Sequence, residues 1–127
     1  MSDKKYKILI VEDEMFSVKA LKKKLEDSDF QVLVAFNGVS GLEVALQEHP
    51  DLILLDLILP EMDGITMLDK LREDDWGKKV PVIILSNLSK ADSIRESRER
   101  GVNTYLVKTD WKLDEVIAKV KYELGIL

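Results

Sequence analysis

Five short runs of apolar, often β-branched residues recur along the chain. Three of them are almost unbroken by polar residues, as in Ile8–Val11, Leu52–Leu55 and Val82–Leu85. A strand with one face in water alternates apolar and polar residues, whereas a strand buried on both faces reads as a continuous apolar run. The sequence therefore predicts a parallel sheet that is covered on both faces.

Segments with helical periodicity separate these runs. Strands are expected at Tyr6–Val11, Gln31–Ala35, Asp51–Leu55, Val80–Leu85 and Asn103–Val107. Helices are expected at Met15–Asp27, Val39–Glu48, Ile65–Asp74, Ser89–Arg100 and Trp111–Leu124. Five β-α units joined by right-handed crossovers form an open parallel sheet with helices on both faces. The predicted fold class is accordingly α/β and doubly wound.

The helix expected at Ser89–Arg100 differs from the others. Only Ala91 and Ile94 are apolar in it, so it should bury little surface and be the most loosely held element. Ser89 with Asp92 resembles a pair of residues that caps a helix. The other predicted helix-end residues are the N-caps Asn37 and Asp110 and the C-terminal stop Gly101.

Composition restricts the function classes. The 127 residues fit one domain, which we expect to span 1–127. Cysteine is absent, which excludes disulfides, thiolate nucleophiles and zinc–thiolate sites and suits a reducing cytoplasm. No apolar run approaches the roughly 20 residues that span a bilayer. The net charge of −5 argues against direct nucleic-acid binding by this domain.

Charged and hydroxyl side chains follow the predicted strands. Glu12 and Asp13 end the first, Asp56 ends the third, Ser86 the fourth and Lys108 the fifth. In a parallel sheet these ends converge on one edge, where ligands bind. A hard cation such as Mg²⁺ relieves the repulsion among clustered carboxylates, and a carboxylate beside it can attack a phosphoryl group. Taken singly, these residues could be solvated loop acids, a turn serine and a strand-end lysine.

Four segments together resemble the response-regulator receiver domain of two-component signalling. They are Ile8–Glu14 (ILIVEDE), Pro50–Gly64 (PDLILLDLILPEMDG), Pro81–Ser86 (PVIILS) and Tyr105–Lys108 (YLVK). The second is the most specific, because Pro60 and Gly64 follow Asp56 at the family's spacing. The resemblance covers essentially the whole chain and implies a flavodoxin-like sheet with the strand order 2-1-3-4-5.

The resemblance also implies a magnesium and phosphoryl site. Asp56 matches the phosphoacceptor, and Lys108 matches the ammonium group that pairs with the bound phosphoryl group. Asp13 and Asp56 match direct Mg²⁺ ligands, joined by the backbone carbonyl of Ile58. Glu12 matches an acid that assists, often through water.

Further positions match the family's switch. Ser86 matches the hydroxyl that moves toward the phosphoryl group, and Tyr105 matches the aromatic side chain whose rotamer reports that movement. Leu57 and Asn87 match residues that donate backbone N–H groups to the phosphoryl oxygens. Such a domain assists its own phosphorylation and dephosphorylation without being a turnover enzyme.

The partners implied are a histidine kinase or phosphotransfer protein, a downstream protein or output domain, and a homodimer that forms on phosphorylation. The sequence departs from the family at two positions. Thr109 follows Lys108 where receivers usually have a cis proline, and because a cis bond before Thr costs about 2.5–4 kcal/mol we expect a trans bond. Asn87 replaces a residue that is usually small.

Three other functions compete with this interpretation. A receiver fold that serves only as an interaction module would not need the five polar residues described above. A hydrolase of the haloacid dehalogenase type requires a second aspartate two residues after the nucleophile, where this chain has Ile58. A flavin-binding protein would carry a phosphate-binding loop rich in Ser, Thr or Gly after the first strand, and this chain does not.

Overall fold

The protein forms one five-stranded parallel sheet in a computed structural model that describes residues 5–126. The strands are β1 (Lys7–Val11), β2 (Gln31–Ala35), β3 (Leu52–Leu55), β4 (Val82–Ser86) and β5 (Thr104–Val107). Their order is β2-β1-β3-β4-β5, and every neighbouring pair is parallel. The predicted α/β class and strand order are thereby confirmed.

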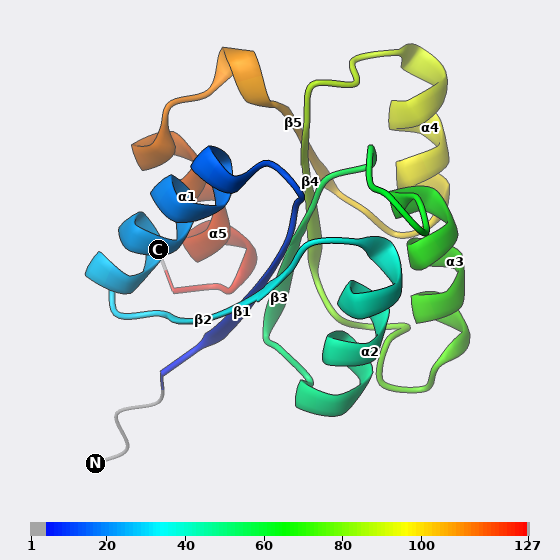
Figure 1. The fold of residues 1–127 in the computed structure, drawn as a ribbon, viewed down its shortest axis with the longest axis horizontal. Coiled ribbons are helices and arrows are strands. Elements are labelled where there is room, and N and C mark those ends of the chain that lie inside the picture. Colours follow the sequence, from blue (N-terminus) through cyan, green and yellow to red (C-terminus); the bar gives the residue numbers. More distant parts are fainter. Residues whose placement is uncertain (1–4, 127) are drawn as a thin grey trace.

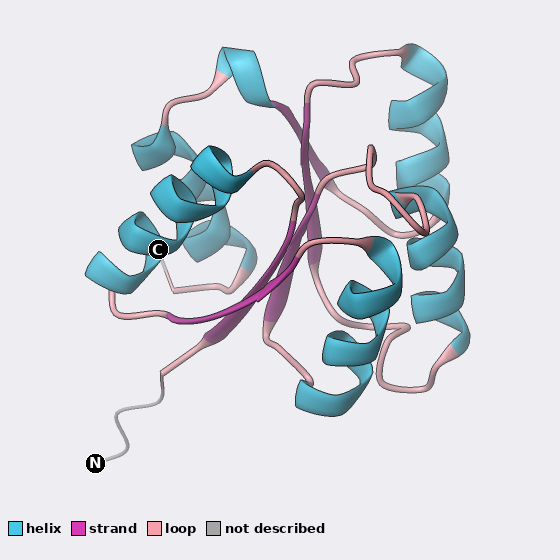
Figure 2. Cartoon of the chain, viewed as in Figure 1, coloured by secondary structure: helices cyan, strands magenta, loops and turns pink. Residues whose placement is uncertain are grey.

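Helices cover both faces of the sheet, as Figures 1 and 2 show. One face carries α1 (Met15–Asp27) and α5 (Leu113–Glu123), and the other carries α2 (Gly38–Glu48), α3 (Gly64–Glu73) and α4 (Ala91–Glu99). A short 3₁₀ helix, η1 (Lys108–Asp110), follows β5. Within residues 5–126, none of the helices has the length and apolar character that crossing a membrane requires.

Side chains alternate between the two faces along each strand and build two separate apolar layers. In β1, Leu9 and Val11 pack toward α2 and α3, whereas Ile8 and Ile10 pack toward α1 and α5. All four side chains are at most 2% exposed. The unbroken apolar runs of the central strands thus supply both layers at once.

Of the three predicted caps at helix N-termini, one is confirmed and two are wrong. Asn37 caps α2 by accepting a hydrogen bond from the Ser40 amide at 2.8 Å. Asp110 lies in η1 instead, because Trp111 packs against the core and α5 begins only after Lys112. The expected Ser89–Asp92 cap does not form: Lys90 occupies the cap position without a side-chain bond, and Asp92 pairs with Arg95 at 2.8 Å.

Helix α4 buries little, as the sequence predicted. Ser97 is its one buried residue, and its first turn lacks a side-chain cap. Its C-terminal end is held firmly: Arg72 Nε donates to the Arg100 carbonyl at 2.9 Å, and Arg100 Nε donates to Asp69 at 2.6 Å. Gly101, with φ of +80°, ends the segment as expected.

The edge of the sheet opposite the strands' carboxyl ends carries two structural contacts. Arg72 Nη1 donates to the carbonyls of Gly77 and Val80 at 2.7 and 2.8 Å, and burial lowers the pKa of its guanidinium group. The exposed His49, in a left-handed turn after α2, stacks on Trp76 with ring centroids 4.2 Å apart. Both contacts join the α3–β4 loop to neighbouring segments.

Candidate functional site

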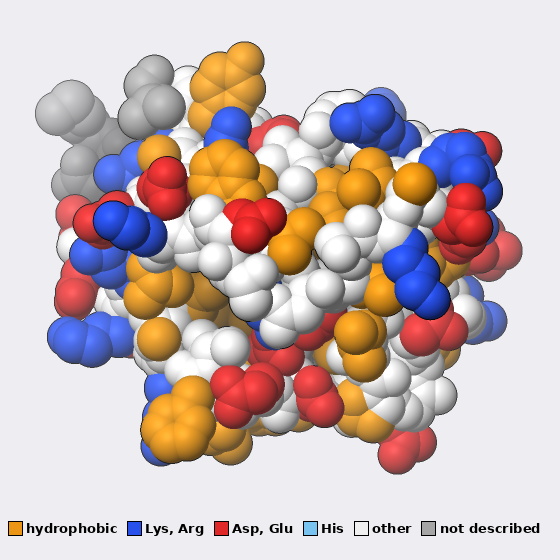
Figure 3. Space-filling view, turned by 90° about the horizontal axis from the view of Figure 1, so that it is seen from above, with side chains coloured by type: hydrophobic (Ala, Val, Ile, Leu, Met, Phe, Trp, Pro, Cys, Tyr) orange, Lys and Arg blue, Asp and Glu red, His pale blue; other side chains and the backbone are white. Residues whose placement is uncertain are grey.

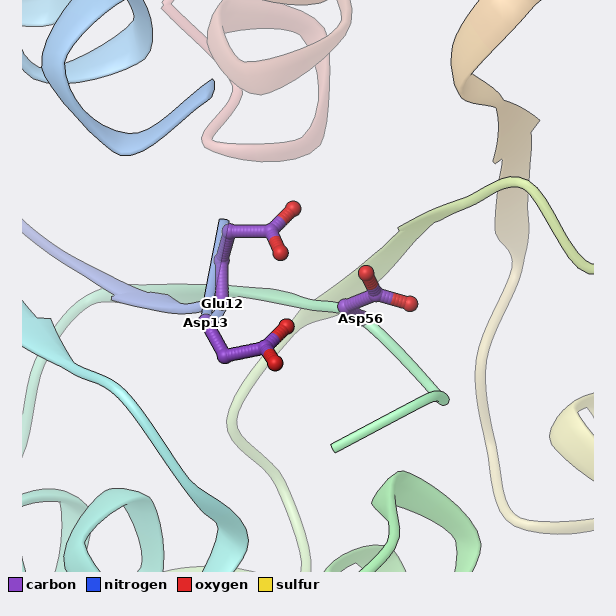
Figure 4. Close-up of side chains that lie close together, drawn as sticks. All are labelled: Glu12, Asp13 and Asp56. Atoms are coloured by element: carbon purple, nitrogen blue, oxygen red, sulfur yellow. The ribbon is translucent and has the colours of Figure 1, made fainter. Parts of the chain in front are cut away.

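Three carboxylates meet at the carboxyl edge of the sheet. Glu12, Asp13 and Asp56 each offer an oxygen within 4.8 Å of the others, and Figure 4 shows their side chains around a common space. Glu12 and Asp56 are buried, at 6% and 7% exposure, whereas Asp13 is exposed. Figure 3 views the molecule from this side and shows several acidic side chains in its lower half.

Backbone hydrogen bonds hold two of these residues in place just past the strand ends. The Asp56 amide donates to the Val11 carbonyl and the Glu12 amide to the Ala35 carbonyl, both at 3.0 Å. The sheet ladder therefore continues by one residue on each strand. This extension fixes the backbone from which the two buried carboxylates project.

Lys108 is the cation of the site. Its Nζ donates to Asp56 Oδ2 at 3.0 Å and to Glu12 Oε1. Burial opposes its charged form, but the hydrogen bonds to Glu12 and Asp56 outweigh that effect and raise the pKa of Lys108. The lysine therefore stays protonated when the site is free of metal.

Burial raises the pKa of Glu12, even though Lys108 and the Glu14 amide stabilise its charged form. Apolar walls contribute to this burial, since an adjoining cavity of about 320 Å³ between α1 and α5 is lined mainly by side chains such as Leu54, Leu85 and Trp111. One ammonium group cannot neutralise three carboxylates. Oxygen donors with an excess of negative charge match the ligands that Mg²⁺ prefers, so these residues fit that ion.

The two oxygens of Asp56 have different partners. Oδ1 accepts from Ser86 Oγ at 2.7 Å and from the Ile58 amide at 3.0 Å, while Oδ2 accepts from Lys108. Ser86 is fully buried, and its oxygen also accepts from the Leu88 amide at 3.2 Å. The serine hydroxyl therefore links Asp56 to the segment that leads into α4.

Tyr105 is half-buried, and its hydroxyl donates to the Leu88 carbonyl. The side chains of Ile58 and Asn87 are exposed, and that of Leu57 is buried. The peptide bonds of the described chain are all trans, so Lys108–Thr109 is trans as expected.

The structure brings Glu12, Asp13, Asp56, Ser86 and Lys108 together, with Tyr105 one contact farther away.

Two residues that shape this edge were not predicted from the sequence. Glu14 caps α1 by accepting from the Phe16 and Ser17 amides at 3.2 and 2.9 Å, and these hydrogen bonds lower its pKa. An acid directly before a helix was the available signal. Leu88 was also not predicted. Its backbone amide and carbonyl form the hydrogen bonds to Ser86 and Tyr105, and such bonds do not depend on which side chain the residue carries.

Comparison with known proteins agrees with this geometry. Residues 8–121 match the family model described as the response regulator receiver domain. Over 94% of each chain, the protein is 36% identical to sporulation initiation phosphotransferase F of Bacillus subtilis. It is 33% identical to the DNA-binding dual master transcriptional regulator RpaA of Synechocystis over 91% of this chain, which spans only 47% of that longer protein.

A solved structure is similar in fold as well. It is the CheX–CheY complex with BeF₃ and Mg²⁺ from Borrelia burgdorferi, with a TM-score of 0.84 and 29% identity. The match covers 92% of this chain and 87% of that one. The chain belongs to the response regulator receiver domain family of two-component signalling.

Proposed function

We propose that this protein is a signalling switch that accepts a phosphoryl group on Asp56 from a histidine kinase or phosphotransfer protein. The observation that carries the proposal is the set of partners of Asp56, since one oxygen meets Ser86 and the other meets Lys108. Glu12 and Asp13 complete an acidic cluster beside it. A buried carboxylate whose oxygens face a hydroxyl and an ammonium group is placed to become an acyl phosphate.

In the proposed reaction, an oxygen of Asp56 attacks the phosphorus atom of a phosphohistidine. The new P–O bond forms as the P–N bond breaks, and the imidazole leaves with the electron pair of that bond. Asp13, Asp56 and the Ile58 carbonyl would hold Mg²⁺, with Glu12 assisting through water. When bound, Mg²⁺ supplies positive charge that stabilises the transferring group.

The residues around Asp56 then change partners. Lys108 pairs with a phosphoryl oxygen, and the backbone N–H groups of Leu57 and Asn87 donate to others. Ser86 leaves Asp56 Oδ1 for the phosphoryl group. Its bond to the Leu88 amide transmits this shift to the segment before α4.

Tyr105 donates to the Leu88 carbonyl, so it follows the same movement. The proposed result is a changed surface formed by α4, β5 and α5. That surface would bind a downstream protein, an output domain or a second copy of this chain. The domain itself contacts no nucleic acid and works in the cytoplasm, and its only catalysis is its own phosphorylation and dephosphorylation.

The test is the binding of beryllofluoride with Mg²⁺, followed by NMR. The CheY relative described above was solved with both, which recommends the pair as a probe. We expect saturable binding and amide shifts centred on residues 56–58, 86–88 and 105–108. The matched control is Asp56→Asn, which keeps the shape of the side chain and should abolish the response.

The alternative is a receiver fold that acts as an interaction module without phosphate. It predicts no saturable beryllofluoride binding in the wild-type protein. That result would overturn the proposed switch.

A further inference from the structure

A contact between two loops lies beside the candidate metal site. The loop from β3 to α3 runs from Asp56 to Asp63 and includes Ile58. Figure 1 shows the start of α2 beside this loop. The Gly38 amide, at the first residue of α2, faces the Pro60 carbonyl at 3.4 Å.

Gly38 leaves no room for a side chain at this contact. A Cβ atom built on Gly38 would lie 1.9 Å from the carbonyl oxygen of Met62 and 2.7 Å from its carbonyl carbon. Ordinary van der Waals contact begins near 3.4 Å. Any residue other than glycine therefore requires the two backbones to move apart by more than about an ångström.

The loop would yield before the helix. Helix α2 is anchored by Ala45, which is fully buried, and by its cap at Asn37. The loop tip is exposed at Pro60 and Glu61, and Glu61 already has a φ of +69°. The loop is fixed at its base, where the Gly64 amide donates to the Leu57 carbonyl at 3.0 Å, so the movement would fall on residues 58–62.

The segment before Gly38 is tied to the other half of the site. The Ala35 carbonyl at the end of β2 accepts from the Glu12 amide at 3.0 Å. The β2–α2 connection therefore contacts the Glu12 side through Ala35 and the Ile58 side through Gly38. It thus touches both backbone segments that carry the proposed ligands.

We propose that Gly38 is a positioning residue for the metal site: by lacking a Cβ atom it lets α2 fix the loop that carries Ile58 at its working distance from Asp13. The inference rests on the proposed function, because it takes Asp13, Asp56 and the Ile58 carbonyl as the ligands of Mg²⁺. Mg²⁺ demands near-ideal octahedral geometry, so a displaced ligand is lost rather than stretched. Residues that orient metal ligands typically change affinity by about 10–100-fold when replaced.

The test compares Gly38→Ala with Gly77→Ala. Gly77 lies in the α3–β4 loop, at the opposite edge of the sheet. It is a matched control, because a Cβ atom on it would lie 2.1 Å from the carbonyl oxygen of Leu71 in α3. Mg²⁺ alone is titrated by calorimetry into the wild-type protein and both variants, and thermal unfolding is measured for each. We expect the affinity to fall at least about tenfold in Gly38→Ala and to stay within about twofold in Gly77→Ala.

NMR of the metal-free proteins gives a second readout. Amide resonances of residues 58–63 should shift in Gly38→Ala and not in Gly77→Ala. Equal Mg²⁺ affinities in the two variants would overturn the inference and leave the proposed function intact. Absence of saturable Mg²⁺ binding in the wild-type protein would overturn both.

A second variant covers failure of Gly38→Ala to fold. Pro60→Gly loosens the same loop tip without creating a clash with α2. If the position of the tip controls the metal site, this variant also binds Mg²⁺ more weakly than Gly77→Ala. An affinity equal to that of the wild-type protein would overturn the inference.

Discussion

At the scale of single residues, the three acids of the site differ in their surroundings. Glu12 and Asp56 are buried and bonded to Lys108, whereas Asp13 is exposed and lies close to both. A buried carboxylate with a partner costs stability when it is removed. Removing an exposed one should cost far less, so Asp13 is the acid whose replacement should separate the proposed metal binding from folding.

We expect Asp13→Asn to lose most Mg²⁺ binding and most phosphorylation while the metal-free protein stays as stable as the wild type. Mg²⁺ at 100 times its dissociation constant should stabilise the wild-type protein by about 2.7 kcal/mol. The variant should show almost none of this gain. Thermal unfolding with and without Mg²⁺ checks the prediction, and Asp29→Asn, an exposed acid in the α1–β2 turn, is the control.

Asp63 supports the site through the helix that follows it. Its carboxylate accepts from the Thr66 amide and hydroxyl at 2.9 Å, and the bond to the amide lowers its pKa. Asp63→Ala should cost about 1 kcal/mol at pH 7, as the loss of an N-cap usually does.

The pH dependence of this effect has a definite sign. A carboxyl group whose pKa is lower in the folded state contributes stability above its unfolded value, about 3.9, and loses it as the pH falls through the folded value. Urea unfolding from pH 7 to pH 2.5 should therefore show the gap between wild type and Asp63→Ala narrowing below about pH 4. Asp63→Asn is the control, because it keeps a cap without the charge. If the stability difference between wild type and Asp63→Ala narrows no more than the difference between Asp63→Asn and Asp63→Ala, the assignment is contradicted.

At the scale of elements, α4 is fixed at one end only. Its last turn is held by Arg72 and Asp69 through Arg100, whereas its first turn has no cap and an exposed Ala91. A weakly docked element needs little differential affinity to change its position. Attachment at the C-terminal end means that such a movement is a swing of the N-terminal end, which is the end next to Leu88.

Hydrogen exchange measures this difference directly. Amides in Ala91–Glu99 should exchange faster than those in Leu113–Glu123, and the first turn of α4 should exchange fastest. Beryllofluoride with Mg²⁺ should change exchange in α4 more than in α5. Equal protection of the two helices would contradict this prediction.

Arg72 is the residue that joins α4 to the α3–β4 loop. Arg72→Met leaves the carbonyls of Arg100, Gly77 and Val80 without this donor, so the free energy of unfolding should fall by about 1–3 kcal/mol. Arg72→Lys keeps the charge, but a single ammonium group cannot reproduce the planar fork, and we expect an intermediate value. Urea unfolding checks this, and a Met variant as stable as the wild type would contradict it.

The elements show why some features could be predicted from sequence. The strands, and hence the polar residues at their ends, follow from local apolar runs and the rule that parallel strands end at one edge. The start of α5 could not be predicted, because Trp111 packs against the core and α5 begins only after Lys112. The contact of Gly38 with Met62 depends on the distance between two loops, for which the sequence holds no local signal.

At the scale of the whole molecule, the sheet separates two apolar layers, which share no side chains within residues 5–126. Leu71 of α3 is fully buried in one layer and Ile117 of α5 is buried in the other. The fold could be predicted as a whole because the same strands supply both layers. The assignment of each helix to a face was not predicted, since it depends on packing over the entire sheet.

Separate layers imply that mutations in them are independent. Leu71→Ala should cost about 2–5 kcal/mol and Ile117→Val about 0.5–1.5 kcal/mol. The double variant should lose their sum within about 0.5 kcal/mol, as distant sites without shared partners do. Urea unfolding of the four proteins measures the coupling, and a deviation above 1 kcal/mol would show that the sheet transmits strain between its faces.

The stack of His49 on Trp76 has a consequence for spectroscopy. The emission of Trp76 therefore reports on this contact, at the edge of the sheet opposite the candidate site. The second tryptophan, Trp111, borders the cavity that also touches Asp56 and Lys108. Fluorescence of the intact protein therefore mixes a signal from the His49 stack at one edge with a signal from the cavity at the other, and Trp76→Phe would leave an optical reporter of the proposed phosphoryl site alone.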